Sequence, residues 1–331
     1  MRLGVAIEDT WSFFNEIYAE FAAHHDVSLF TRRNPPLPIF KERLARRRFQ
    51  SDLRTFMQEN DVVFFEWASE LLAHATQVPS TCGIVTRLHR FELYQWADRV
   101  NWDAVDRIIL VSESKRLEFS ERFPAQSHKL VVIPEAVSVE RFRPHAQPFQ
   151  GNIATLCHLR PRKRVYDLIL AFHELSQRRS DLHLHIGGGR SNGFEEYEIA
   201  LHRLVNRLDL SSRVTFYDHI ARPEEWYGAM DIFISNSYSE GLQVSALEAM
   251  ASGCFCLSHF WEGADELLPP ENLFFTEREL IDRVLTYCSL PEPEKQARCA
   301  AMRQIVEGRH DLSTTKVQIR QVVESVQNKA R

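Results

Sequence analysis

Short apolar runs alternate with longer amphipathic stretches along the first 133 residues of the chain. The runs are rich in branched and aromatic residues and have the length of buried strands; they cover residues 3–7, 27–30, 62–65, 83–86, 107–111 and 130–133. The stretches between them place apolar residues at helical spacing, near 13–24, 41–58, 68–77 and 113–122. Strands and helices that alternate at this spacing predict a parallel sheet with helices on both faces.

The same alternation resumes after a proline-containing segment from Pro144 to Gly151, which is typical of a linker. Strand-like runs follow at 152–156, 182–186, 213–216, 231–234, 254–257 and 273–275. From residue 280 onward the pattern is helical, with a break at Pro291-Glu292-Pro293. The length of 331 residues also suits two domains. We therefore expect α/β domains at residues 1–145 and 151–315.

Composition excludes several classes of protein. The formal net charge is −5, so no overall basic field favours nucleic acid as a partner. No apolar run approaches the roughly 20 residues of a membrane-spanning helix. Glu8 comes too early for a signal peptide, and the six cysteines form no C-x-x-C pair, which is typical of reduced thiols. These features predict a cytoplasmic protein.

The segment 41–54 is strongly basic. It carries cations interleaved with apolar residues at helical spacing, namely Lys41, Arg43, Arg46, Arg47, Arg48 and Arg54. Basic amphipathic helices bind anionic membrane surfaces, and the protein would then be peripheral at the inner face of the membrane. The alternative is a helix packed on the core with a solvated arginine face. The sequence leaves both interpretations open.

The most informative stretch runs from 234 to 256 and has the sequence I-S-N-S-Y-S-E-G-L-Q-V-S-A-L-E-A-M-A-S-G-C-F-C. Turn-forming residues follow a short strand, and a helical pattern then extends from Leu242 to Gly253. The N-terminus of such a helix offers free backbone N–H groups and the positive end of the helix dipole, which suit a phosphate. Glu240 precedes this helix and Glu248 lies within it. On their own, two such carboxylates could equally be solvated surface groups.

Four stretches of the chain together resemble the retaining GT-B glycosyltransferases, in particular family 4, and stand in the family's order. E-G-L-Q-V-S-A-L-E at 240–248 resembles the E-x7-E signature. C-H-L-R-P-R-K-R-V at 157–165 resembles G-R-L-x-P-x-K-G-V, H-I-G-G-G-R at 185–190 resembles a G-x-G step, and R-V-T-F-Y-D at 213–218 resembles R-V-x-F-x-G. The resemblance spans nearly all of residues 151–275, whereas the first domain shares only the architecture.

The resemblance implies the GT-B fold, an α/β architecture in which two Rossmann-like doubly wound parallel-sheet domains face a central cleft. The first domain binds the acceptor and the second binds the nucleotide sugar. In such enzymes a C-terminal helix returns to the first domain, and the periodic valines near residues 316–331 suit that place.

The resemblance also assigns a donor site in the second domain. Lys163 corresponds to the family lysine that holds the diphosphate, Glu240 contacts the transferred sugar or the departing phosphate, and Glu248 accepts hydrogen bonds from the ribose. The candidate donor-binding residues are His158, Arg160, Lys163, Gly187, Gly188, Gly189, His219, Ile220, Glu240, Gly241, Leu242, Gln243, Val244 and Glu248. Among them, His219 and Ile220 are expected to hold the base.

One of these positions departs from the family pattern. His158 replaces the family arginine, and a neutral imidazole offers one donor in place of a guanidinium fork. Arg160 or Arg162 would compensate for this loss. Cations are disfavoured at a helix N-terminus, so a basic cluster at this place is best explained by a nearby anion rather than by solvation alone.

In the first domain, T-R-L-H-R-F-E at 86–92 follows the fourth strand, at the edge where parallel sheets bind their ligands. His89 matches a family position that touches the transferred sugar, and it joins Glu240 and Lys163 as a candidate catalytic residue. The candidate acceptor-binding residues are Arg87, Arg90 and Glu92.

No metal site is predicted from the sequence. No D-x-D carboxylate pair occurs, and His183 and His185 share a strand face without a third ligand nearby, so they are expected to be core or edge histidines. The co-substrate implied by the resemblance is a nucleotide-diphosphate sugar, with no cofactor and no metal required.

The sequence thus predicts a retaining, metal-independent glycosyltransferase of the hexosyltransferase type. It would move a sugar from a nucleotide-diphosphate sugar to a glycan or lipid-linked saccharide, as in polysaccharide or glycoconjugate biosynthesis. Two alternatives stay open. One is a nucleotide-sugar epimerase on the same scaffold, and the other is a non-catalytic, glycosyltransferase-like subunit that binds a nucleotide or a partner enzyme.

Overall fold

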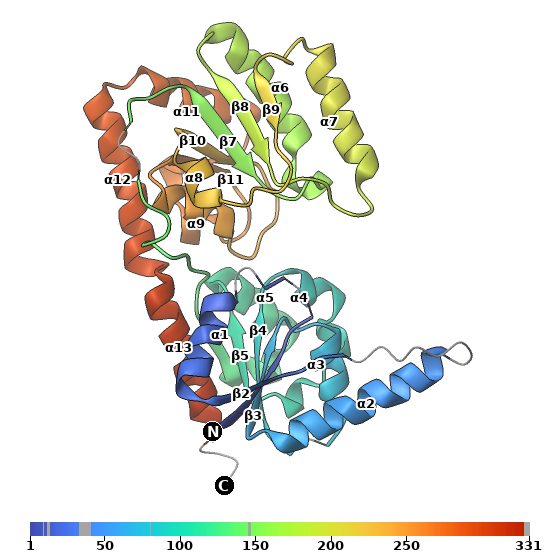
Figure 1. Ribbon diagram of the computed structural model, residues 1–331. Helices are drawn as coiled ribbons and strands as arrows, with labels where there is room; N and C mark the ends of the chain where they lie inside the picture. The colour runs from blue at the N-terminus through green and yellow to red at the C-terminus, as the bar shows by residue number, and fades with distance from the viewer. Residues whose placement is uncertain (9, 12–13, 33–40, 80, 145–146, 328–331) are drawn as a thin grey trace. The chain divides into compact units, whose positions relative to one another are not determined.

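A computed structural model describes residues 1–331 except 9, 12–13, 33–40, 80, 145–146 and 328–331, and it describes no side chains at 41–46. The chain divides into two compact units (Figure 1). Unit 1 comprises Met1–Pro134 with Ser313–Arg331, and unit 2 comprises Glu135–Leu312. Sequence analysis placed the first boundary at residue 145. The structure places it about ten residues earlier, because the segment after Pro134 bonds to unit 2, with Val137 N–H donating to the His310 carbonyl over 2.9 Å.

Unit 1 is built on one parallel sheet of six strands in the order β2-β1-β3-β4-β5-β6. The strands are β1 (Arg2–Ala6), β2 (Asp26–Leu29), β3 (Val62–Glu66), β4 (Gly83–Leu88), β5 (Arg107–Leu110) and β6 (Leu130–Val132). The helices are α1 (Asn15–His24), α2 (Lys41–Glu59), α3 (Glu70–Ala75), α4 (Phe91–Gln95), α5 (Glu113–Arg122) and α13 (Leu312–Gln327). The central strands β3 and β4 are buried along their whole length, as expected for strands covered on both faces.

The C-terminal helix α13 packs on the sheet of unit 1 beside α1 (Figure 1). Ile319 and Val323 are fully buried, and Arg320 Nε donates to the Glu20 carboxylate of α1 over 3.0 Å. A Cβ at Gly83 of β4 would lie 2.3 Å from Val326, so only glycine admits this close approach of the helix.

Helix α2 buries an apolar stripe formed by Phe49, Leu53 and Phe56 in the core of unit 1. Arg47, Arg48 and Arg54 are exposed, so these three cations form the solvated face of a core-packed helix. The side chains of Lys41, Arg43 and Arg46 lie outside the described residues. Membrane contact through 41–54 therefore stays a prediction. Within the described residues, no helix combines the length and the apolarity needed to cross a bilayer.

Unit 2 repeats the architecture with the strand order β12-β11-β10-β7-β8-β9, and every pair is parallel. The strands are β7 (Asn152–Leu156), β8 (His183–Gly187), β9 (Val214–Phe216), β10 (Ile232–Ser235), β11 (Phe255–His259) and β12 (Leu273–Phe274). The helices are α6 (Val165–Arg178), α7 (Glu195–Arg207), α8 (Pro223–Tyr227), α9 (Val244–Ala251), α10 (Ala264–Leu267), α11 (Glu277–Ser289) and α12 (Glu292–Arg309).

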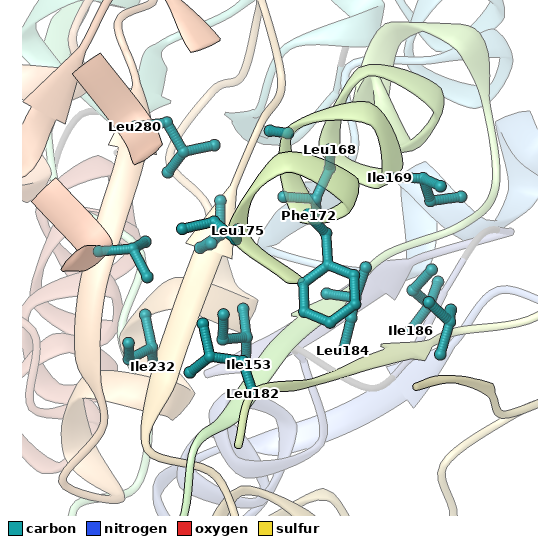
Figure 2. Close-up of a cluster of buried hydrophobic side chains, with 14 of the residues drawn as sticks. Ile153, Leu168, Ile169, Phe172, Leu175, Leu182, Leu184, Ile186, Ile232 and Leu280 are labelled. Atoms are coloured by element: carbon teal, nitrogen blue, oxygen red, sulfur yellow. The ribbon is translucent and has the colours of Figure 1, made fainter. Parts of the chain in front are cut away.

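The core of unit 2 fixes the position of α6. Figure 2 shows Leu168, Phe172 and Leu175 of this helix pointing at strand residues such as Leu184 of β8. Each of these side chains is 1% exposed or less, and burying one such side chain contributes about 1.5–3 kcal/mol. The first turn of α6 is thereby held beside the carboxyl end of β7. β7 and β10 are neighbouring strands, and the strands that follow each of them in sequence lie on opposite sides of the sheet. The carboxyl ends of two such strands are the usual ligand-binding position of open α/β sheets.

Candidate functional site

An ion-paired cluster joins the loops that follow β7 and β10. Lys163 Nζ donates to Glu240 Oε1 over 2.6 Å, and Arg162 Nη1 lies 2.8 Å from Glu240 Oε2. The Glu240 side chain is 9% exposed and that of Lys163 is 12% exposed. Burial alone would raise the pKa of Glu240, but the charges of Lys163 and Arg162 outweigh it and lower this pKa to about 2. The cluster therefore holds a carboxylate that stays ionised throughout the neutral range.

Backbone contacts fasten the two loops together. Asn236 Nδ2 donates to the Arg164 carbonyl over 3.0 Å, and Tyr238 N–H donates to the Arg162 carbonyl over 3.3 Å. Arg164 has a φ of 49°, a left-handed conformation that non-glycine residues rarely adopt. This conformation ends the short turn Pro161–Lys163 and starts α6. The turn thus sets the direction in which Arg162 and Lys163 leave the backbone.

Helix α9 begins at Val244, directly after this cluster. Gln243 occupies the N-cap position, but its side chain makes no capping bond to the helix backbone. It is instead held by Ser235 and by Ser245, whose Oγ accepts from Gln243 Nε2 over 3.0 Å. The first N–H groups of α9 therefore have no side-chain cap and form an N-terminus suited to an anion.

Glu248 lies eight residues after Glu240 and is a half-buried residue of α9. The single O–H of Tyr227, which is fully buried, is shared between two acceptors, the Ser245 carbonyl at 3.0 Å and Glu248 Oε2 at 3.3 Å. Burial raises the pKa of Glu248 to about 7, although the Tyr227 hydroxyl and the charge of Arg141 act in the opposite direction. Glu248 is therefore poised between its acid and its carboxylate near neutral pH.

This raised pKa predicts how Glu248 makes stability depend on pH. The folded chain binds more protons at this site than the unfolded chain between pH 4.5 and about 7, so the stability that Glu248 contributes falls as pH rises through that window, by up to about 3 kcal/mol. A Glu248→Gln variant should lack this fall. Urea unfolding of both proteins from pH 5 to 8 measures it, and parallel pH profiles would contradict the expectation.

The glycine turn after β8 packs against the loop after β7. Cys157 N–H donates to the Gly187 carbonyl over 3.0 Å, and Leu159 N–H donates to the Gly189 carbonyl over 3.2 Å. Gly188 N–H donates to the Asp218 carbonyl over 3.3 Å, which brings the turn next to His219 and Ile220. His219 is exposed and Ile220 is half-buried. The predicted base-pocket residues thus lie beside the glycine turn, at the same edge of the sheet.

A Gly188→Ala substitution is expected to destabilise unit 2 by about 2–4 kcal/mol through backbone strain and overpacking. Gly188 has a φ of 114°, and a Cβ there would lie 2.2 Å from the Cys157 carbonyl oxygen. Gly193 is a matched control because its φ is 79° and nothing lies within 4 Å of its Cβ position. Gly193→Ala should cost only about 1 kcal/mol. Similar losses for the two variants, measured by urea unfolding, would contradict this account.

The remaining basic residues of the predicted site are placed differently from one another. Arg160 Nε donates to Ser191 Oγ over 2.7 Å, and its guanidinium lies 5.7 Å from the centre of the Phe194 ring. It does not join the Glu240 cluster, whereas Arg162 does. His158 is exposed as a residue, and partial desolvation of its ring together with the charges of Arg160 and Lys163 lowers its pKa. Of the two arginines proposed to compensate for His158, Arg162 is the one that the structure brings to the cluster.

The predicted residues of unit 1 gather at the carboxyl ends of β3 and β4. His89 Nε2 lies 2.8 Å from Glu66 Oε1, and the same oxygen accepts from Arg87 Nη1 over 3.3 Å. The Glu92 carboxylate accepts from the backbone N–H groups of His89 and Arg90, each over 3.1 Å, and its burial raises its pKa. Arg87 is 1% exposed and Glu92 is fully buried, so both support the loop rather than present a surface.

The sequence patterns did not indicate three residues of these clusters, namely Glu66, Trp67 and Tyr227. The indole of Trp67, which has a φ of 74°, stacks on the His89 ring with centroids 3.9 Å apart. Glu66 and Trp67 therefore hold the His89 ring from one edge and one face.

The hydrogen-bond partners of His183 and His185 agree with the prediction that both are core or edge histidines. His183 Nε2 lies 2.8 Å from Thr215 Oγ1, and His185 Nδ1 lies 2.9 Å from the Tyr217 hydroxyl. Both are half-buried histidines on the strand face. Within the described residues, no group of three or more His, Cys, Asp and Glu side chains is arranged to hold a metal ion.

Comparison with known sequences finds a family match in unit 2. Residues 150–288 match the model of the family Glycosyl transferases group 1. A D-inositol 3-phosphate glycosyltransferase of Catenulispora acidiphila is 29% identical over 167 residues, which cover 46% of this chain and 39% of the relative. A mannosylfructose-phosphate synthase of Agrobacterium fabrum is 31% identical over 111 residues, covering 32% of this chain and 24% of the relative. The matches thus span about two fifths or less of these curated relatives.

Comparison with solved structures covers nearly the whole chain. HepE of Anabaena in complex with UDP and glucose gives a TM-score of 0.79 at 20% identity, covering 98% of this chain and 99% of that one. Sucrose-phosphate synthase of Thermosynechococcus elongatus gives 0.79 at 16% identity, covering 98% of both chains. At this identity the likeness concerns the fold, and it confirms the predicted α/β GT-B architecture of two Rossmann-like domains.

Proposed function

We propose that this chain, whose residues 150–288 match the model of the Glycosyl transferases group 1 family, is a glycosyltransferase that takes its sugar from a nucleotide-diphosphate sugar. The observation that carries the proposal is the Lys163–Glu240 pair at 2.6 Å, held beside the uncapped N-terminus of α9. A solved structure of the same fold holds UDP and glucose, which supports a nucleoside diphosphate sugar as the donor class.

The proposed sugar transfer depends on the positive charge at Lys163 and at the N-terminus of α9. Cleavage of the bond between the anomeric carbon and the diphosphate places the bonding electron pair, and hence negative charge, on the departing diphosphate. The Lys163 ammonium and the first N–H groups of α9 are preorganised to meet that charge. Because these groups supply positive charge from the protein, the proposed reaction requires no metal. Glu240 holds the Lys163 ammonium in place and offers its carboxylate to the sugar hydroxyls.

Glu248 is proposed to select the ribose of the donor. Its carboxylate lies on α9, and the Tyr227 hydroxyl orients one of its two oxygens. The second oxygen then accepts from a ribose hydroxyl. Binding of this kind favours the ionised form, so donor binding would draw a proton from Glu248 near neutral pH.

We propose that unit 1 binds the acceptor. His89, ordered by Glu66 and Trp67, is the candidate group that meets the transferred sugar, and Arg90 is the half-buried cation beside it. We propose a saccharide acceptor, either a glycan or a lipid-linked saccharide, with retention of anomeric configuration through attack on the same face as the departing diphosphate. A cytoplasmic location and peripheral membrane contact through 41–54 stand as part of the same proposal.

Product analysis tests this function and separates the alternatives. The purified chain is incubated with a panel of nucleotide sugars and saccharide acceptors, and the products are followed by NMR. Released nucleoside diphosphate together with a new glycosidic linkage of the donor's anomeric configuration is expected. An inverted linkage would contradict retention. A changed sugar still attached to its nucleotide would identify an epimerase, and bound but unchanged donor would identify a non-catalytic subunit.

A further inference from the structure

A pocket of about 700 Å³ lies in unit 2, and none of the candidate donor residues lines it. Three of its lining residues, Phe149, Asp231 and Gly253, come shortly before β7, β10 and β11, respectively. The donor residues instead follow β7 and β10. Because these strands are parallel, the pocket lies at the amino ends of the strands, and a strand length separates it from the Lys163–Glu240 cluster. Its volume is typical of sites for small molecules.

One wall of this pocket is a stripe along α12. Lys295, Cys299 and Arg303 follow one another at four-residue spacing, which places them on one face of the helix. Helix α12 packs against α9 and β11. The stripe is anchored by Arg303, whose Nη1 donates to the Phe142 carbonyl over 2.8 Å and whose Nε donates to Glu307 over 2.7 Å.

Lys295 is the group in this wall that lacks a polar partner. The residue is 8% exposed, and its ammonium lies 4.4 Å from the centre of the Phe149 ring. Across the part of the chain that the structure describes, its ammonium makes no hydrogen bond and no ion pair. An ammonium carries three donors, and the contact with the Phe149 ring satisfies none of them by a hydrogen bond, so the ammonium is available to a ligand in the pocket. Such a group indicates an anionic ligand.

A second buried donor lines the same pocket without a partner. Ser252 is 4% exposed, and its Oγ has no hydrogen-bond partner among the described residues. The apolar part of the lining includes Pro148, Phe149, Met230 and Tyr287. The Ser252 Oγ is inaccessible from the pocket, so the pocket itself joins one cation to an apolar surface.

The other charges of the pocket limit the charge of the ligand. Both oxygens of Asp231 are engaged by the backbone N–H groups of Gln150 and Asn152, and Arg303 is paired with Glu307. Glu292 adds a further negative charge to the lining. Asp231 and Glu292 would repel a doubly charged phosphate more strongly than a ligand with a single negative charge, which can pair with Lys295. A carboxylate fits this balance better than a phosphate.

We propose that this pocket binds a small organic monocarboxylate, whose carboxylate pairs with the Lys295 ammonium and whose apolar body lies against Phe149, Met230 and Tyr287. The site is separate from the donor site, and the proposal does not rest on the proposed sugar transfer.

Titration of the full chain with 4-phenylbutyrate tests this site, with 4-phenylbutan-1-ol as the neutral probe of the same shape. The methyl resonance of Met230, one of five methionines in the chain, reports on the pocket wall. We expect saturable binding of the carboxylate, weakened at least about tenfold in Lys295→Leu and for the alcohol. Arg298→Leu is the matched control, because Arg298 is an exposed cation of α12 outside the pocket lining.

Three results would overturn the site. They are an unsaturable or absent shift of the Met230 resonance, equal binding of the alcohol, and unchanged binding of the carboxylate by Lys295→Leu. Thermal unfolding without ligand gives an independent readout. Lys295→Leu should raise Tm relative to Arg298→Leu, because it replaces a largely buried lysine, whose ammonium has no polar partner among the described residues, by an apolar side chain. An equal or lower Tm would show that the protein already satisfies this ammonium, which also overturns the proposal.

Discussion

A Lys163→Met variant is expected to transfer sugar about 10²–10³ times more slowly than the wild-type chain, the loss typical when one donor to a developing negative charge is removed. Methionine keeps the length of the side chain but removes the ammonium that lies 2.6 Å from Glu240. Glu240 keeps its contact with Arg162 at 2.8 Å, so the loop should hold its position. The loss should therefore appear in kcat more than in KM, and steady-state kinetics with saturating acceptor measure it.

Arg178→Met is the matched control for the loss of one positive charge from the same helix region. Arg178 is exposed and pairs with Glu174 one turn earlier on α6. Exposed pairs of this kind contribute about 0–1 kcal/mol, so the control should keep its rate and its stability. A Lys163→Met variant that retains the wild-type rate within about twofold would contradict the role given to the ammonium.

A Glu66→Gln variant is expected to lose about 3 kcal/mol or more of unfolding free energy, because it removes one partner of a buried ion pair. The Glu66 and Arg87 side chains are 0% and 1% exposed, and the same Glu66 oxygen also lies 2.8 Å from His89 Nε2. Glutamine keeps the shape and loses the charge. Urea unfolding followed by tryptophan fluorescence measures the change, and Trp67 beside His89 reports on unit 1.

Glu70→Gln is the control for this second prediction. Glu70 is an exposed carboxylate on α3 whose Oε2 lies 3.2 Å from Arg32, and its loss should cost less than about 1 kcal/mol. Nucleotide binding should survive Glu66→Gln, because the candidate donor residues all belong to unit 2. Equal stability losses in the two variants would contradict the buried pair as the support of His89.

The sequence predicted the two sheets because apolar runs of strand length are a local pattern. The order of four motifs singled out Lys163 and Glu240 as candidates, whereas their ion pair and the neighbouring positions of β7 and β10 are known only from the structure. The choice between Arg160 and Arg162 was beyond such reasoning. It depends on the turn Pro161–Lys163 and on the left-handed backbone of Arg164, which decide which side chain points to Glu240.

Glu66 illustrates a different limit. It ends the apolar run V-V-F-F-E of β3, and a carboxylate at the end of a buried strand was a visible signal. Its partner was not visible, because the pairing depends on strand register. In the structure Glu66 lies opposite Arg87 on the neighbouring strand β4, which brings the two charges together in the interior. Tyr227 could not be predicted for a similar reason. Its contact with Glu248 depends on the tertiary packing of α8 against α9.

Calorimetric titration of UDP, GDP, dTDP, CMP and ADP into the wild-type chain and a Glu248→Ala variant tests the central claim most directly, namely that unit 2 binds a nucleoside diphosphate. We expect clear binding of one nucleoside diphosphate, weakened at least about tenfold by Glu248→Ala, which corresponds to the loss of a charged hydrogen bond to the ribose. Absence of binding by all five nucleotides, or equal affinity in the two proteins, would contradict the account.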